Sequence, residues 1–242
     1  MSQAIAAELA PTGTLRAGVN MSNFLLVTGK TSCGDPEGVS PSMAAEIAKR
    51  LGVPVSYVLY DTPRELAEAS TRDEWDIGLI GAEPARAKTI TFTAAYCEIE
   101  ATYLVPAGSP FQSVDEVDSA GTRIAVYTTS AYGLWMQRNI KHAELVPADG
   151  LGSSLDLFIQ DKLDALAGLR PRLLTDVETL PGARILEGGF TAVQQAIGTR
   201  PERQASAEWL SQFAEEVKAS AFVQQLIDRF GVTGRLTVAP LA

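Results

Sequence analysis

The apolar positions along the first half of the chain follow two different periods. Residues 77–80 form a short apolar run of the length of a buried strand, and residues 15–19 and the β-branched and aromatic run 53–60 are two further predicted strands. Between these runs, apolar side chains recur every three or four residues, which predicts a helix over residues 41–51 and a shorter one over residues 63–70. This strand–helix–strand–helix–strand order is typical of a parallel sheet with crossover helices.

The same order of elements returns in the second half. The predicted strands and helices, in chain order, are a strand at 123–127, a helix at 130–139, strands at 143–146 and 164–169, and between these two a helix capped by Ser153. Ser113 and Glu116 have the spacing of a capping box for one more short helix. No residues are repeated between the halves, so the repetition is architectural, and it indicates two similar α/β lobes.

The chain ends with an extended run over residues 192–197 and two amphipathic helices. The extended run could return the chain to the first lobe. One helix is striped by Trp209, Phe213 and Val217, and the other by apolar residues from Phe222 to Phe230. At helical spacing such aromatic side chains face a protein core.

Composition narrows the class of function. The chain has 242 residues, of which 46% are hydrophobic and 20% charged, as in ordinary soluble globular proteins. The net charge of −9 argues against nucleic acid as a partner, because no basic patch is available for a phosphate backbone. No apolar run approaches the roughly 20 residues that span a bilayer, so we expect no membrane insertion.

Cysteine and histidine are scarce. The single histidine, His142, has no neighbours that could form a nucleophilic relay or a metal cluster, so neither a metal nor another cofactor is predicted. Cys33 and Cys97 could form a disulfide, although free thiols are the favoured alternative.

The most specific pattern lies within residues 75–106, WDIGLIGAEPARAKTITFTAAYCEIEATYLVP. A buried run is followed by Pro84 and Arg86, then by Phe92 and Tyr96, and then by a second extended run. This order resembles the middle of the family-3, amino-acid-type solute-binding proteins of bacterial ABC importers. The resemblance implies a type II periplasmic-binding fold, in which two Rossmann-like α/β lobes are joined by a two-strand hinge.

The resemblance extends over nearly the whole chain and implies its domain organisation. The first lobe would comprise residues 1–98 and 197–242, and the second residues 99–196. The hinge strands would lie near 97–105 and 190–198. Such a protein is expected to be a monomer that closes on a small anionic metabolite and, if exported, delivers it to an ABC permease.

In the first lobe, the resemblance makes Arg86 the residue that grips a ligand carboxylate. A planar guanidinium can pair with both carboxylate oxygens, although a loop position or an internal ion pair would also explain an arginine here. Gly81 stands where the family often has a threonine hydroxyl, so that contact would be lost or left to the backbone. Phe24 could stack on the ligand or pack in the core, and the Gln194 amide could contact the ligand.

In the second lobe, Thr129 and Ser130 match the family's Gly-Ser-Thr segment at a helix start. Backbone N–H groups and the Ser130 hydroxyl could hold an anion there, or Ser130 could simply cap the helix. Leu169 replaces the aspartate that takes the α-ammonium group in amino-acid binders, and leucine accepts no hydrogen bond. Arg170 could supply a second positive charge, so we expect an organic acid or an atypical amino acid as ligand.

Glu98 and Glu100 alternate along the first hinge strand and leave two further functions open. They could bind an amine, but hinge residues paired with lysine or arginine are the favoured interpretation. If the protein were an enzyme, as in cyclohexadienyl dehydratase, which resembles this fold, either could be the general acid. A sensor lobe without its membrane anchor is a third hypothesis.

The cellular location stays open. Family members normally carry an export signal, but the first 20 residues have neither a basic n-region nor an apolar h-region of about 7–15 residues. Either a leader has been removed and the protein is periplasmic, or Met1 is the native start and the protein is cytoplasmic. The second alternative is slightly favoured.

Overall fold

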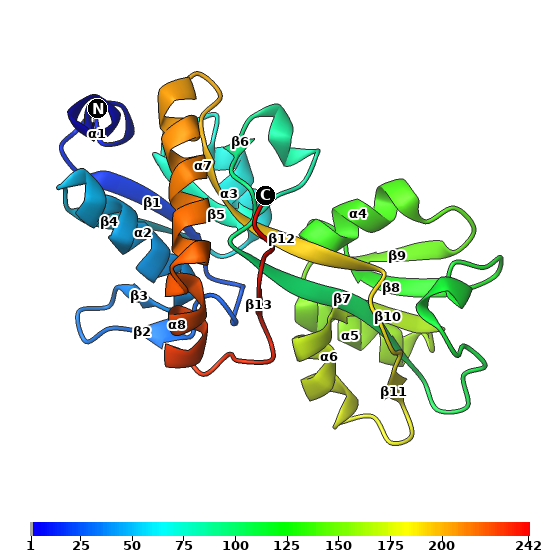
Figure 1. The fold of residues 1–242 in the computed structure, drawn as a ribbon. Coiled ribbons are helices and arrows are strands. Elements are labelled where there is room, and N and C mark those ends of the chain that lie inside the picture. The colour runs from blue at the N-terminus through cyan, green and yellow to red at the C-terminus, as the bar shows by residue number, and fades with distance from the viewer. Residues whose placement is uncertain (1) are drawn as a thin grey trace. The chain divides into compact units, whose positions relative to one another are not determined.

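The computed structural model describes residues 2–242, which form two compact α/β units. One unit contains the chain up to Glu98 together with Gln194–Ala242, and the other contains Ile99–Val193. Both boundaries fall inside long strands, β7 (Cys97–Val105) and β12 (Thr191–Thr199). The chain therefore passes between the units within continuous strands (Figure 1).

The first unit is built around a sheet in which β1 lies between β4 and β5 and is parallel to both. β5 pairs antiparallel with β12, and β6 pairs with β12 as well. The elements of this unit are α1 (Ser2–Leu9), β1 (Leu15–Asn20), β2 (Gly29–Lys30), β3 (Pro36–Glu37), α2 (Val39–Leu51), β4 (Val55–Tyr60), α3 (Pro63–Ala69), β5 (Ile77–Gly81), the 3-10 helix η1 (Arg86–Lys88), β6 (Thr91–Phe92), α7 (Gln204–Ala219), α8 (Phe222–Arg229) and β13 (Thr237–Val238).

Glycines in the central strands let α3 pack close to the sheet. A Cβ atom at Gly18 would lie 3.1 Å from the Trp75 side chain, and one at Gly78 would lie 3.1 Å from Leu66 and 3.2 Å from Trp75. Both of these side chains are buried, and the Trp75 indole N–H donates to the Leu66 carbonyl at 3.0 Å. The small residues in β1 and β5 therefore make room for the largest core side chain of this face.

The second unit contains the order β7-β10-β8-β9, in which β10 is antiparallel to β7 and parallel to β8. β11 also pairs with β7. Its elements are β7, the 3-10 helix η2 (Val114–Glu116), β8 (Arg123–Tyr127), α4 (Ala131–Asn139), β9 (Glu144–Ala148), α5 (Leu151–Gln160), β10 (Ala165–Leu169), α6 (Arg170–Val177), β11 (Arg184–Ile185) and the start of β12.

The alternation of side chains along these strands divides the core of the second unit into two clusters. Ala165 and Ala167 of β10 face the cluster that includes α4, whereas Leu166 faces Phe158 of α5 and Leu173 of α6. This is the period of two that a strand imposes on its side chains. The sheet is covered on both faces, as buried parallel strands require.

Most predicted elements are confirmed to within two residues, but two predicted helix caps are wrong. α5 begins at Leu151 with Gly150 as its N-cap, and the Ser153 hydroxyl donates to the Gly150 carbonyl instead of capping. The segment after Ser113 is a short 3-10 helix without a side-chain cap, because the Glu116 carboxylate accepts the N–H of Gln112, one residue earlier than the capping box expects.

A buried carboxylate, Asp76, joins the first strand of the first unit to the segment before β5. Its side chain is 0% exposed and accepts from the Arg16 backbone N–H and Nε at 2.9 and 3.0 Å. The Arg203 guanidinium donates to the same carboxylate at 3.1 Å. In return, the Asp76 N–H donates to the Arg16 carbonyl at 2.8 Å. The carboxylate therefore has its lone pairs satisfied inside the protein.

The second unit repeats this link with other residues. The Arg123 N–H donates to the Asp164 carboxylate at 2.8 Å, and the Asp164 N–H donates to the Arg123 carbonyl at 3.0 Å. Both aspartates end an Asp-x-x-Asp sequence, at 73–76 and 161–164, whose third residue is buried. Our expectation that no residues repeat between the halves is therefore wrong.

Replacing Asp76 with alanine is expected to lower the free energy of unfolding by about 3–5 kcal/mol, because Arg203 would be left buried beside an empty site. Chemical denaturation monitored by tryptophan fluorescence measures this loss. Asp61→Ala, which removes an exposed carboxylate of the same unit, is the control and should change stability by less than about 0.5 kcal/mol. Equal effects of the two substitutions would contradict the assignment.

Candidate functional site

The predicted ligand residues of the first unit lie after the carboxyl ends of two neighbouring parallel strands. Phe24 follows β1, and Arg86 follows β5. The carboxyl edge of a parallel sheet is where α/β proteins bind ligands, because the loops there diverge and helix N-termini point toward them. Sequence and topology therefore assign both residues to the same edge.

Arg86 is the first residue of η1 and is only 6% exposed. Its Nη1 donates to the carbonyl oxygen of Gly81 at 2.7 Å, and its backbone N–H donates to the Glu83 carbonyl at 2.9 Å. The Gly81 carbonyl thus orients the guanidinium. The sequence had drawn attention to Gly81 for a different reason, namely that it stands where the family often has a threonine hydroxyl. The predicted alternative of an exposed loop arginine is wrong.

Gln194 and Phe24 also have defined surroundings in this unit. The Gln194 carbonyl accepts from the Ala82 N–H at 2.7 Å, so the backbone of Gln194 lies beside the end of β5 that holds Arg86. Phe24 is half-buried, and the Arg235 guanidinium lies 5.7 Å from the centroid of its ring. Gly81, Arg86 and Gln194 are therefore neighbours, while Phe24 is placed by the strand order alone.

In the second unit, Ser130 caps α4 directly after β8. Its Oγ accepts from the Gly133 N–H at 2.9 Å and donates to the Tyr127 carbonyl at 2.6 Å. The capping role that we considered for Ser130 is therefore confirmed. Thr129, one residue earlier, is half-buried at the same edge. A helix N-terminus of this kind presents backbone N–H groups and a positive dipole end.

Leu169 and Arg170 lie at the carboxyl end of β10, the parallel neighbour of β8. The Arg170 Nη2 donates to Glu100 Oε1 at 2.8 Å, to the Leu186 carbonyl at 3.0 Å and to the Gly188 carbonyl at 2.8 Å. Glu100 is thus a strand residue paired with arginine, the favoured interpretation of the sequence. Glu98 lies two residues before Glu100 in β7, in register with Thr237 of β13.

Two residues of α4 that were not predicted to belong to the site, Tyr132 and Gly133, also lie at this edge. A Cβ atom at Gly133 would lie 2.2 Å from the Tyr127 carbonyl, so only glycine lets the first turn of α4 approach β8 this closely. Tyr132 is buried, and desolvation raises the pKa of its hydroxyl. Within residues 2–242 that hydroxyl has no hydrogen-bond partner. A glycine inside the first turn of a predicted helix was the signal available in the sequence.

The described part of the chain contains no group of three histidine, cysteine, aspartate or glutamate residues that could hold a metal ion. Cys33 is exposed and Cys97 is buried, and both are free thiols. Burial raises the pKa of the Cys97 thiol, which keeps it protonated and unreactive. Over residues 2–242, no helix has the length and apolar character needed to cross a membrane.

Comparison with known proteins gives one match to a family. The model of the bacterial extracellular solute-binding proteins, family 3, matches residues 15–233. No curated protein sequence matches the chain.

Several solved structures share the fold at low sequence identity. An ancestral amino-acid-binding protein, AncCDT-1, described as a precursor of cyclohexadienyl dehydratase, is 18% identical with a TM-score of 0.72, over 93% of this chain and 98% of its own. A binding component of an ABC transporter from Wolinella succinogenes, complexed with lysine, is 18% identical with a TM-score of 0.73, over 90% and 95% of the two chains.

A third structure is the amino acid ABC transporter substrate-binding protein AbpA from Streptococcus pneumoniae, bound to L-arginine. It is 19% identical with a TM-score of 0.71, over 93% of this chain and 97% of its own. The fold is therefore that of the type II periplasmic binding proteins, as the sequence predicted.

Replacing Ser130 with alanine is expected to lower the free energy of unfolding by about 1 kcal/mol, because α4 loses its N-cap acceptor. Ser130→Gly should cost only a few tenths of a kcal/mol, since glycine also serves as an N-cap. Thermal unfolding of the three proteins without ligand checks this ranking. Equal stability of the alanine and glycine variants would show that the hydroxyl does not support the helix.

Proposed function

Because the chain belongs to the bacterial extracellular solute-binding proteins, family 3, we propose that it binds a small metabolite carrying a carboxylate and delivers it to an ABC permease. The solved structures with bound lysine and arginine support a ligand of about the size of an amino acid. The family establishes solute binding for transport, and the carboxylate is our inference from Arg86 and the role that the family resemblance implies for it.

Arg86 carries the proposal. It is a buried cation at the carboxyl edge of β5, in a chain whose net charge is −9. The bond from its Nη1 to the Gly81 carbonyl fixes the plane of the guanidinium. A fixed guanidinium loses little side-chain entropy when it pairs with a carboxylate, and the pair is strengthened by exclusion of water.

The second unit bears on the rest of the ligand. Leu169 offers no acceptor for an α-ammonium group, and the positive charge of Arg170 is compensated by Glu100. This pairing weighs against a second carboxylate bound by Arg170. We therefore propose an organic acid with one carboxylate, or an amino acid whose ammonium group is recognised at another position.

A lyase on the same fold is the alternative function. Glu100 is poorly suited to the role of general acid, because its side chain is held in an ion pair with Arg170 at 2.8 Å. Glu98 would then have to supply the proton. Nothing at Glu98 favours this over a structural role on the strand, so binding without turnover is the preferred function.

Replacing Arg86 with alanine is expected to weaken binding of small carboxylates at least tenfold, because a charge-assisted pair contributes about 1.5–3 kcal/mol. Ligands would first be found by a thermal-shift screen of mono- and dicarboxylates, keto acids and amino acids, and affinities then measured by calorimetry. Lys88→Ala removes an exposed cation from the same 3-10 helix and should leave affinity unchanged. An affinity of Arg86→Ala within threefold of the parent protein would refute the carboxylate anchor.

Replacing Leu169 with aspartate is expected to strengthen binding of ordinary α-amino acids about tenfold or more, because the carboxylate would restore an acceptor for the ammonium group. Leu169→Asn, which adds an acceptor without a charge, is the matched control and should gain less. If neither variant binds α-amino acids more tightly than the parent protein, our explanation of this position is wrong.

A further inference from the structure

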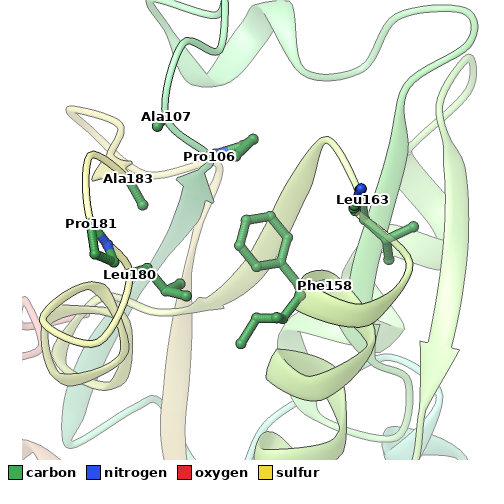
Figure 2. Close-up of a pocket in the computed structure, with 9 residues that line it drawn as sticks. Pro106, Ala107, Phe158, Leu163, Leu180, Pro181 and Ala183 are labelled. Carbon is green, nitrogen blue, oxygen red and sulfur yellow. The ribbon is translucent and has the colours of Figure 1, made fainter.

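A cavity of about 250 Å³ opens in the second unit, and Figure 2 shows residues that line it. It is at the edge of the sheet where β10 starts, opposite Ser130 and Leu169. It lies between the end of α5, the turn that follows β7 and the turn that precedes β11. β10 starts beside this cavity and ends at Leu169. The seven residues from Leu163 to Leu169 span about 20 Å when extended, so the cavity is separate from the proposed ligand site.

Two tight turns form one wall of the cavity. The Ser109 N–H donates to the Pro106 carbonyl at 3.1 Å, and the Ala183 N–H donates to the Leu180 carbonyl at 3.1 Å. Each turn has a glycine with a positive φ at its third position, Gly108 at 76° and Gly182 at 77°. This is the arrangement of a type II turn.

These turns are held against each other and against β11. A Cβ atom at Gly182 would lie 2.8 Å from the Ala107 Cβ, so the turns touch. The Arg184 guanidinium donates to the carbonyl oxygens of Ser109 and Phe111 and anchors the first turn. The wall is therefore rigid, and the cavity cannot close simply by movement of a loose loop.

The opposite wall comes from α5, and its surface is apolar. Phe158 and Leu163 are buried beside the cavity, and Leu180 and Pro181 face them from the turn (Figure 2). Ile159, which also lines the cavity, is 46% exposed and adds to this apolar surface. A site of this size and polarity fits a hydrocarbon group better than a sugar or a polar metabolite.

One lining residue, Lys162, is charged, and its backbone conformation is unusual for lysine. It lies two residues beyond the end of α5 and has a φ of 49°, in the left-handed region that favours glycine. Within residues 2–242 its ammonium group forms no ion pair. In the corresponding turn of the first unit the left-handed residue is Asp73, and its carboxylate forms an ion pair with Arg16. The cavity therefore has an apolar interior and one cation among its lining residues.

We propose that this cavity binds a small apolar monoanion, namely an acid with a hydrocarbon group of about the size of a phenyl ring. A cavity of about 150 Å³ accommodates benzene, so 250 Å³ leaves room for a ring with a short acidic side chain. The ring would contact Phe158, Leu180 and Ile159, and the acidic group would lie at Lys162. This site would be occupied independently of the solute held at Arg86.

Titration of the ¹⁵N-labelled protein with phenylacetate, followed by amide chemical shifts, tests the proposal. Phenylacetate should saturate a site whose shifts centre on residues 158–163 and 180–183. It should bind about fivefold or more tightly than the neutral 2-phenylethanol and the cationic phenethylamine, because an opposite charge near a protein surface favours only the anion. No saturable shifts in these segments, or equal affinity for the three probes, would overturn the proposal.

Two variants separate the cavity from the fold. Lys162→Gly suits the left-handed backbone, so the melting temperature should stay the same or rise while the preference for phenylacetate over 2-phenylethanol disappears. Ala183→Leu fills the cavity and should abolish binding of all three probes, whereas Ala205→Leu on the exposed first turn of α7 should not. Unchanged phenylacetate binding in both Lys162→Gly and Ala183→Leu would place the probe elsewhere and refute the site.

Discussion

The reciprocal hydrogen bonds between an arginine on the first strand and an aspartate before a neighbouring parallel strand hold each unit in register. In the first unit this aspartate, Asp76, is fully buried and is compensated by Arg16 and Arg203. The Arg16 guanidinium also holds the pKa of Asp73 below its usual value, since it donates directly to that carboxylate. A buried carboxylate is tolerated only when such donors surround it, so one misplaced strand would leave a charge unpaired.

This link lies at the amino edge of both parallel sheets and leaves the carboxyl edge available for other groups. Arg16 and Arg123 bind backbone or aspartate oxygens before β5 and β10. Arg86 and Ser130, by contrast, follow the last residues of β5 and β8. Charges that hold the fold and groups assigned to the ligand are thus separated along the strands, so a change at one edge need not disturb the other.

The sequence predicted the positions of the strands and helices along the chain, because these depend on the local periodicity of apolar residues in buried strands and amphipathic helices. It placed Arg86 and Ser130 through a motif and a cap signal. It could not show that Ser153 lies inside α5, because Gly150 and Ser153 are both acceptable starts and packing decides between them. The cavity beside Lys162 was equally hidden, since it arises from turns and a helix end that are distant in sequence.

The pairing of Arg170 shows why a residue type at a matching position does not by itself define a ligand contact. Gly189 allows Glu100 to lie close by, because a Cβ atom there would lie 2.6 Å from the Glu100 Cγ. Arg170 then joins Glu100 of β7 to the carbonyls of Leu186 and Gly188, which precede β12. The Arg170–Glu100 pair carries no net charge. The carboxyl end of β10 therefore offers little electrostatic attraction to an anion. The proposed carboxylate ligand would therefore depend on Arg86, and not on Arg170, for a charge-assisted hydrogen bond.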